Sequence, residues 1–460
     1  MSPRVAVLGG GVAGLAAAHR LVGRGARDVV LLEAGDRLGG SIATERAGGF
    51  TIEAGADSLL TEKPWAVDLC ERLGVLLVGT REGERRTYVV HDGRLEPLPE
   101  GFLLLAPTDL RALAASPLFS WRGKLRMALD LVLPRRGGER DESLADFVRR
   151  RLGREALERL AEPLAAGIYT ADAERLSLAA AMPRFRDLER RHRSLILGLR
   201  AEARGVPAAG ARYGLFAAPA DGMGTLIEAL ARRLPEGAVR LRARATGLAR
   251  DGGSWRLRAG TEPLVADGLV LATPAYATAK LVEGLDPTLA AALGAIDYAS
   301  SATVTLAYRA ADAGALAGLG FVVPAVERRP LLACTYTSRK FPGRAPDGHE
   351  LLRAFVGGAR RAEALGLDDA ALAAAVRAEF AALLAISATP VLARVHRHDR
   401  AMPQYAVGHL EQVAAIEARA AALPALALGG AAYRGVGIPD CVRSGETAAD
   451  TVGDTLLARA

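Results

Sequence analysis

Cysteine and long apolar runs are scarce in this sequence, and each scarcity excludes a class of protein. The three cysteines, Cys70, Cys334 and Cys441, lie too far apart for a metal-binding spacing or a disulfide framework, which favours a reducing cytoplasm. No apolar run reaches the ~18 residues of a transmembrane helix. The chain also enters a strand almost at once, so we expect no secretory signal and a cytoplasmic protein.

Aromatic residues make up only 5% of the chain, and nearly all of its basic residues are arginine. The net charge of +7 is spread over a chain rich in alanine, glycine and arginine, so we interpret it as a bias of the whole composition. Because no basic stripe is interleaved with aromatic residues, we expect no binding to nucleic acid. The positive charge instead favours acidic substrates or an anionic membrane surface.

Motifs for nucleophilic, zinc or nucleotide-hydrolysing catalysis are missing. The sequence has no nucleophile elbow, no zinc-binding helix and no Walker loop. His396, His398 and Asp399 lie close together in the chain, but they are too few for a metal site, and we expect no metal. An enzyme whose cofactor does most of the chemistry is compatible with this lack of catalytic motifs.

What the sequence does contain is a complete dinucleotide-binding motif in its first forty residues. Gly9, Gly11 and Gly14 form a G-x-G-x-x-G turn between an apolar strand and a helix. Glu33 closes the next strand, nineteen residues after Gly14, where an acid accepts hydrogen bonds from a ribose. This context predicts that the helix N-terminus faces a pyrophosphate.

A second glycine-rich turn lies near the other end of the chain. A strand over 425–430 leads to the loop Gly435–Cys441 and then to a helix over 442–457. The buried strand over 269–273 ends at another turn, so the nucleotide-binding domain is predicted to be discontinuous. A cofactor held from both chain ends is longer than a mononucleotide. Since no second G-x-G-x-x-G occurs, we favour a tightly held flavin that is reoxidised by dioxygen over one that works with NAD(P)H.

The middle of the chain contains a strand-rich part and a helix-rich part. Strand patterns recur from 301 to 356 and predict a second, largely antiparallel sheet. Earlier in the chain, 238–248 is predicted to form a single strand. Helical periodicity dominates 95–204. Within it, 102–133 is apolar with basic residues between, which is compatible with the core of a helical domain or with a face that rests on a membrane.

Several motifs along the whole chain resemble the oxygen-dependent porphyrinogen oxidases of haem synthesis, within the flavin amine oxidase superfamily. The glycine turn with Glu33-Ala34 and the segment Glu53–Ser58 are typical of the superfamily. Four further segments are specific to porphyrinogen oxidases, and they are Glu162–Tyr169, His192–Gly198, Met402–Tyr405 with Gly408-His409, and Gly435–Cys441.

The resemblance implies an α/β protein with a Rossmann-like FAD-binding domain (1–80, 206–284 and 426–460), a mixed-sheet substrate-binding domain (81–95 and 285–425) and a helical, membrane-facing domain (96–205). It further implies removal of six hydrogens from a porphyrinogen in three two-electron steps, with dioxygen as oxidant and hydrogen peroxide as product. The implied FAD contacts are Gly9, Gly10, Gly11, Val12, Ala13, Gly14, Glu33, Ala34, Ser41, Ala54, Gly55, Ala56, Asp57, Ala245, Thr273, Val436, Gly437 and Ile438.

The substrate is either coproporphyrinogen III or protoporphyrinogen IX. Asp57, Lys63 and Ile168 resemble the bacterial branch that acts on coproporphyrinogen. We expect Lys63 to pair with a propionate, with Arg85 as a weaker candidate. Asp57 either accepts pyrrole N–H bonds or holds its loop, and Ile168 forms an apolar wall or helix core. The implied partners also include the membrane surface and the next enzyme of haem synthesis.

Two other interpretations stay open at this point. The first is another flavin oxidase, acting on amines or carotenoids; such amine oxidases attach their flavin through a cysteine near the C-terminus, where Cys441 lies. We interpret Cys441 as packing beside the cofactor instead. The second is a porphyrin carrier or pathway scaffold that retains FAD without catalysis.

Overall fold

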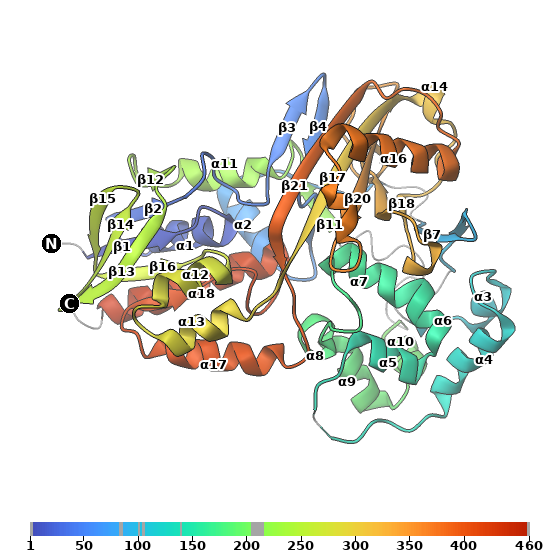
Figure 1. Cartoon of the computed structure of the whole chain (residues 1–460), viewed down its shortest axis with the longest axis horizontal. Helices are drawn as coiled ribbons and strands as arrows, with labels where there is room; N and C mark the ends of the chain where they lie inside the picture. Colours follow the sequence, from blue (N-terminus) through green and yellow to red (C-terminus); the bar gives the residue numbers. More distant parts are fainter. Residues whose placement is uncertain are drawn as a thin grey trace.

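The computed structural model describes residues 3–81, 86–99, 102–103, 106–138, 140–203 and 216–457. Three regions are visible in Figure 1: a sheet-and-helix region that carries both chain ends, a second region built on a long sheet, and a group of helices. In the described part of the chain, no helix is both long and apolar enough to cross a membrane.

A parallel five-stranded sheet lies in the first region, and its strands come from widely separated parts of the sequence. The order is β12-β2-β1-β16-β22, with every neighbouring pair parallel. This confirms the predicted Rossmann-like α/β fold. Its strands are β1 (Arg4–Leu8), β2 (Asp28–Leu32), β12 (Val239–Arg240), β16 (Gly268–Leu271) and β22 (Leu426–Leu428).

Helices from both ends of the chain cover one face of this sheet. Helices α1 (Val12–Gly23) and α18 (Ile438–Leu457) pack closely, and a Cβ on Gly445 would lie 2.0 Å from the carbonyl oxygen of Ala13. Glycine at position 445 is therefore what lets the two backbones approach. The same apolar cluster includes α2 (Trp65–Leu73) and α11 (Gly224–Arg232).

The other face of the sheet is covered by three helices and a small antiparallel sheet. The helices are α12 (Ala275–Val282), α13 (Pro287–Gly294) and α17 (His409–Ala421), and the strands are β13 (Ala245–Asp251), β14 (Ser254–Ala259) and β15 (Glu262–Ala266). The single strand predicted over 238–248 is wrong. The chain breaks between β12 and β13, where Arg242 takes a positive φ of 52° and its N–H bonds the carbonyl oxygen of Gly35.

A mixed seven-stranded sheet forms the second region, as predicted. The order is β21-β17-β20-β19-β18-β7-β8, antiparallel except between β18 and β7. Helix α16 (Asp369–Leu384) packs on it. The strands are β7 (Tyr88–His91), β8 (Arg94–Pro97), β17 (Tyr298–Arg309), β18 (Gly320–Val322), β19 (Leu331–Tyr336), β20 (His349–Gly357) and β21 (Leu392–Pro403). Smaller sheets pair β3 (Thr44–Ala47) with β4 (Phe50–Glu53), and β11 (Phe216–Pro219) with β5 (Leu59–Leu60) and β6 (Leu77–Gly79).

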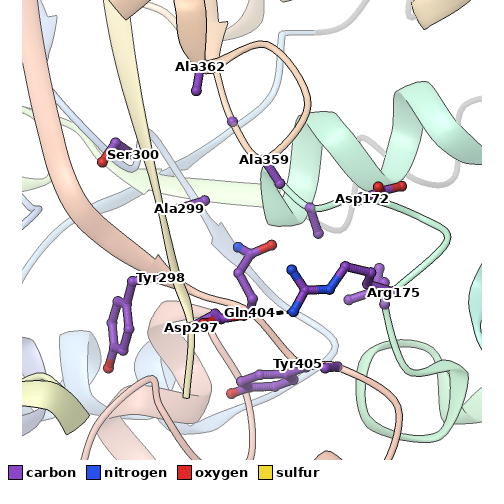
Figure 2. A pocket seen from close by; sticks show the side chains of 14 residues that line it. Asp172, Arg175, Asp297, Tyr298, Ala299, Ser300, Ala359, Ala362, Gln404 and Tyr405 are labelled. Atoms are coloured by element: carbon purple, nitrogen blue, oxygen red, sulfur yellow. Dashed lines mark hydrogen bonds and ion pairs between the residues drawn. The ribbon is translucent and has the colours of Figure 1, made fainter. Parts of the chain in front are cut away.

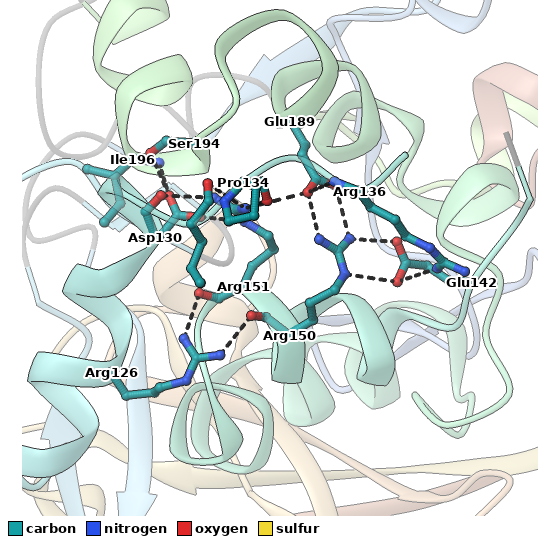
Figure 3. A network of polar contacts seen from close by, with 11 residues as sticks. Arg126, Asp130, Pro134, Arg136, Glu142, Arg150, Arg151, Glu189, Ser194 and Ile196 are labelled. Carbon is teal, nitrogen blue, oxygen red and sulfur yellow. Dashed lines mark hydrogen bonds and ion pairs between the residues drawn. The ribbon is translucent and has the colours of Figure 1, made fainter. Parts of the chain in front are cut away.

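The third region is helical and is braced internally by charged side chains. The guanidinium of Arg151 and the carboxylate of Asp130 are both fully buried, and Arg151 Nε donates to Asp130 across 2.7 Å (Figure 3). Ser194 adds a hydroxyl donor to the same carboxylate at 2.6 Å. The pair is thus satisfied by hydrogen bonds as well as by charge, as a buried ion pair requires. The helices include α3 (Leu110–Ala115), α4 (Trp121–Ala128), α5 (Leu144–Arg151), α6 (Arg154–Ala156), α7 (Glu162–Tyr169), α8 (Leu178–Ala181), α9 (Pro183–His192) and α10 (Leu195–Ala203).

Candidate cofactor and substrate site

The turn between β1 and α1, called here the N-terminal turn (Gly9–Gly14), requires glycine for two different reasons. Gly9 has φ of +108°, and a Cβ on Gly14 would lie 1.9 Å from the carbonyl oxygen of Gly9. A Cβ on Gly11, in contrast, would meet nothing within 4 Å. No side chain caps the first turn of α1. The space beside Gly11 and the uncapped N–H groups therefore fit a pyrophosphate.

Glu33 lies at this turn, as the motif predicts. Its two carboxylate oxygens accept hydrogen bonds from the backbone N–H groups of Gly10 at 2.7 Å and Gly35 at 2.6 Å. The carbonyl oxygen of Glu33 accepts from the N–H of Ala243, which brings the segment before Ala245 beside it. Thr273, the second residue after β16, lies next to the turn, because a Cβ on Gly9 would lie 3.2 Å from its backbone nitrogen.

Ser41 and the loop over 53–58 lie against each other. A Cβ on Gly55 would come within 2.0 Å of the carbonyl oxygen of Ser41, so only glycine permits this approach. Ala54 is buried, whereas Ala34 and Ser41 are exposed beyond the end of β2. The structure thus gathers the N-terminal turn, Glu33 and the loop over 53–58 at one end of the parallel sheet.

The carbonyl groups of the loop over 53–58 are held by side chains of the seven-stranded sheet. Arg353 Nη1 donates to the carbonyl oxygens of Glu53 at 3.1 Å and Gly55 at 2.8 Å. The carbonyl oxygen of Ala54 accepts from Thr303 Oγ1 at 2.7 Å and from His398 Nε2 at 2.8 Å. A loop predicted to contact FAD is therefore fixed by the neighbouring region.

Asp57 is buried and surrounded by cationic side chains. Its carboxylate lies 3.0 Å from Lys340 Nζ and 3.3 Å from Arg353 Nη2, and Ser58 donates to it at 2.7 Å. Burial alone would raise the pKa of Asp57, but Lys340 and Arg353 hold it well below its usual range. These contacts agree with the interpretation that Asp57 holds its loop, since both of its oxygens already have partners.

The second half of the site is the C-terminal loop (Ala431–Gly437), which leads from β22 to α18. The hydroxyl of Tyr405 donates to the carbonyl oxygen of Ala431 at 2.6 Å and accepts from the N–H of Gly435 at 2.8 Å. His409 stacks on Tyr405 with ring centres 3.9 Å apart, and its Nε2 donates to the carbonyl oxygen of Tyr433 at 2.9 Å. Two side chains from the end of β21 and the start of α17 thus fix this loop.

Lys63 contacts the same end of α18. Its Nζ lies 2.7 and 2.8 Å from the carboxylate oxygens of Asp440, in the first turn of the helix. Asp440 therefore forms an ion pair with Lys63, and its negative charge also lies at the N-terminus of α18, where the helix dipole favours an anion. The predicted propionate partner of Lys63 is thus replaced here by a carboxylate of the protein. Ile168, on α7, is exposed, and Arg85 lies outside the described residues.

A pocket of 440 Å³ opens where the helical region meets the seven-stranded sheet (Figure 2). An ion pair of 2.7 Å between Arg175 and Asp297 crosses it. The side chain of Gln404 reaches into it and donates to the carbonyl oxygen of Tyr169 at 3.3 Å. None of the residues predicted to bind FAD or substrate lines this pocket.

Sequence reasoning assigned no role to Lys340, Arg353, Thr303, Tyr405 and His409. Tyr405 and His409 stand within a motif that was noted, and Lys340 is one of only four lysines in the chain. Arg353 and Thr303 carry no signal, because arginine and threonine in a strand are ordinary.

Comparison with known proteins gives a consistent result. Residues 12–453 match the family described as flavin containing amine oxidoreductase. A coproporphyrinogen III oxidase from Bacillus subtilis is 35% identical, with 96% of each chain covered. One from Propionibacterium freudenreichii is 36% identical over 98% of this chain and 91% of the relative. A protoporphyrinogen oxidase from Bos taurus is 32% identical, with 98% of both covered.

Solved structures agree with the fold. A crystal structure of a protein from Exiguobacterium sp. 255-15 superposes with a TM-score of 0.89 at 32% identity, covering 98% of this chain and 99% of that one. A cyclohexylamine oxidase from Brevibacterium oxydans has a TM-score of 0.72 at 19% identity, covering 99% of this chain and 100% of that one. The second likeness supports the fold alone.

Proposed function

The chain belongs to the family of flavin-containing amine oxidoreductases, and we propose that it is an FAD-dependent porphyrinogen oxidase of haem biosynthesis that uses dioxygen. One observation carries this proposal: the relatives named coproporphyrinogen III oxidase match nearly the whole chain at 32% to 36% identity. The candidate site supports this proposal, because it has two glycine-rich segments, one near each end of the chain, that suit a single dinucleotide cofactor.

FAD, when bound, would supply the redox chemistry by accepting a hydride from a bridging methylene of the porphyrinogen. The protein itself binds the cofactor and the substrate and orients them for hydride transfer. The N-terminal turn would bind the pyrophosphate, Glu33 would accept hydrogen bonds from the ribose hydroxyls, and the loop over 53–58 and the C-terminal loop would complete the cofactor site. Three rounds remove six hydrogens, with one dioxygen reduced to hydrogen peroxide in each round. Over the three rounds the four methylene bridges lose four hydrogens, three as hydride and one as a proton, and two pyrrole nitrogens lose their N–H protons to solvent, so no dedicated protein base is needed.

Coproporphyrinogen III is the substrate we propose, with protoporphyrinogen IX as the second candidate. The choice rests on the names of the bacterial relatives and on Asp57, Lys63 and Ile168. In this proposal Lys63 exchanges Asp440 for a substrate propionate, and Ile168 offers an apolar surface to the macrocycle. Arg85 stays a candidate for a second propionate.

We further propose that the helical region contacts an anionic membrane, and that the protein contacts the next enzyme of haem synthesis there. Trp121, Leu125, Leu129 and Val132 are all exposed, and their spacing places them on one helical face. The only acid between 110 and 136 is Asp130, which is fully buried, while that segment has six basic residues: Arg111, Arg122, Lys124, Arg126, Arg135 and Arg136. Vesicle binding tests this contact: the protein should bind anionic vesicles but not neutral ones. The double variant Trp121→Ser/Leu125→Ser should lose this binding. Equal binding by the variant and the wild type would refute the contact.

The substrate is tested by an aerobic fluorescence assay on the purified holoenzyme. Coproporphyrinogen III should become fluorescent faster than protoporphyrinogen IX, with hydrogen peroxide released in both cases. A yellow protein that leaves both porphyrinogens non-fluorescent would support a carrier and contradict the proposal. A flavin that stays attached after denaturation would instead favour an amine oxidase with a covalent link at Cys441.

A further inference from the structure

Five charged side chains cluster in and behind the loop over 53–58, four of them buried and Lys340 with a side chain that is 12% exposed. Two are acidic, Glu53 and Asp57, and three are basic, Lys340, Arg344 and Arg353. The basic residues exceed the acidic ones by one even when both carboxyl groups are ionised. Burial raises the pKa of Glu53 above its ordinary value. A buried excess of positive charge is costly unless an anion offsets it.

The hydrogen-bond partners of Arg344 and Arg353 supply too little negative charge to offset this excess. Arg344 donates to the carbonyl oxygens of Pro219 at 2.9 Å and Ala220 at 2.8 Å, so its hydrogen bonds go to neutral groups. Arg353 shares Asp57 with Lys340 and otherwise bonds the backbone. The Nε atoms of Arg344 and Arg353 have no hydrogen-bond partner among the described residues. The cluster is therefore incompletely neutralised by the protein.

The cluster also lies close to the place where FAD is proposed to bind. Arg353 and Lys340 contact the loop over 53–58 directly, at Glu53, Gly55, Asp57 and Ser58. They come from β20 and from the short helix α15 (Thr337–Lys340), on the side of the seven-stranded sheet. The charge thus lies directly behind a loop that is proposed to face the flavin.

We propose that Lys340 and Arg353 are positioning residues that raise the reduction potential of the flavin through the excess positive charge behind this loop. The inference rests on the proposed FAD site. A hydride brings two electrons and one proton, so its arrival adds one negative charge to the flavin ring. Nearby fixed positive charge favours that state over the oxidised one, because charge close to the ring tunes its electronics. Asp57 opposes the effect, since it neutralises part of the cluster.

The test is the reduction potential of the bound flavin, measured by dye equilibration without any porphyrinogen. Lys340→Met removes a positive charge and should make the potential more negative. Asp57→Asn removes a negative charge and should make it more positive. Arg339→Met is the matched control, because Arg339 is the neighbouring residue on α15 but bonds Glu350 at 2.8 Å instead of Asp57. That control should leave the potential unchanged.

Lys340→Arg keeps the positive charge but changes the shape of the side chain, so it separates the two effects. It also provides a second comparison with Lys340→Met if Asp57→Asn does not retain its flavin. It should restore the wild-type potential that Lys340→Met loses. An unchanged potential in Lys340→Met, or shifts of the same sign in Lys340→Met and Asp57→Asn, would overturn the inference. Because no substrate is present, these results are independent of which porphyrinogen is oxidised; a protein that binds no FAD would instead refute the proposed function.

Discussion

The two glycine-rich segments that we propose to face the cofactor are held in place in different ways. The N-terminal turn is fixed mainly by its own backbone, because a Cβ on Gly14 would collide with the carbonyl oxygen of Gly9, five residues earlier. The C-terminal loop is fixed by distant side chains, since Tyr405 bonds Ala431 and Gly435 from the end of β21. One segment therefore depends on local sterics, and the other depends on the packing of separate regions. The two should respond differently to substitution.

The largest effects are expected in the N-terminal turn, where two glycines separate folding from binding. Gly14→Val forces a Cβ to within 1.9 Å of a carbonyl oxygen and should abolish FAD binding and destabilise the parallel sheet. Gly11→Ala meets nothing within 4 Å, so it should fold normally yet bind FAD at least ~10-fold more weakly, because the methyl group enters the space for the pyrophosphate. Thermal unfolding and flavin titration measure the two effects. Unchanged affinity in Gly11→Ala would show that the phosphates lie elsewhere.

A smaller effect is expected from Tyr405→Phe in the C-terminal loop. The change leaves the carbonyl oxygen of Ala431 and the N–H of Gly435 without their shared partner, which costs about 1–3 kcal/mol in a buried setting. We expect FAD affinity to fall by up to ~10-fold, since that energy is what shapes the loop.

Tyr308→Phe is the matched control for this change. Tyr308 is buried in the core of the seven-stranded sheet, and its hydroxyl has no hydrogen-bond partner among the residues described. Its loss should leave flavin affinity unchanged. Equal losses of affinity in the two variants would contradict the assigned role of Tyr405.

Lys63→Ala should have a still smaller effect on the C-terminal loop. The side chain of Lys63 is 41% exposed, so solvent screens its ion pair with Asp440, and the pair contributes roughly 0–1 kcal/mol. FAD affinity should change less than in Tyr405→Phe. The Michaelis constant should rise more for coproporphyrinogen III than for protoporphyrinogen IX, because the former carries four propionates and the latter two. Equal rises for both substrates would exclude a propionate role for Lys63.

The smallest expected effect is the response of the C-terminal loop to pH. Burial lowers the pKa of His409, and Arg434 lowers it further. The unfolded chain therefore binds a proton at about pH 6.5 more readily than the folded chain, so this contribution to stability is complete above pH 6.5 and is lost as pH falls. His409→Gln should lessen the drop in thermal midpoint between pH 7 and pH 5. An unaltered drop would mean that other groups cause it.

The same contrast explains what the sequence could predict. The N-terminal turn with its flanking strand and helix is a local pattern, and so is the unit of strand, loop and helix over 425–457, which the structure confirms with β22 and α18. Strand β21 went unpredicted because its middle, from His396 to Arg400, is entirely polar and only one of its twelve residues is buried, so it lacks an alternating apolar pattern. Its length and pairing come from β17, which lies about ninety residues earlier.

The contacts that complete the candidate site could not be predicted from the sequence either. Lys63 and Asp440 are 377 residues apart, and Arg353 reaches Glu53 across 300. Nothing in the local sequence of Lys63 indicates that its partner is the first turn of the last helix. Only the folded arrangement brings these charges together, which is why the protein partners of Asp57 and Lys63 were not predicted.

The most direct test of the whole account is an anaerobic titration of the holoenzyme with coproporphyrinogen III, followed through the flavin absorbance and the porphyrin fluorescence. Each porphyrin formed should reduce three equivalents of enzyme-bound FAD, because six hydrogens leave in three two-electron steps. Admitting dioxygen should then restore the oxidised spectrum. Porphyrin formation without loss of flavin absorbance, or no response of the flavin to the porphyrinogen, would contradict the account.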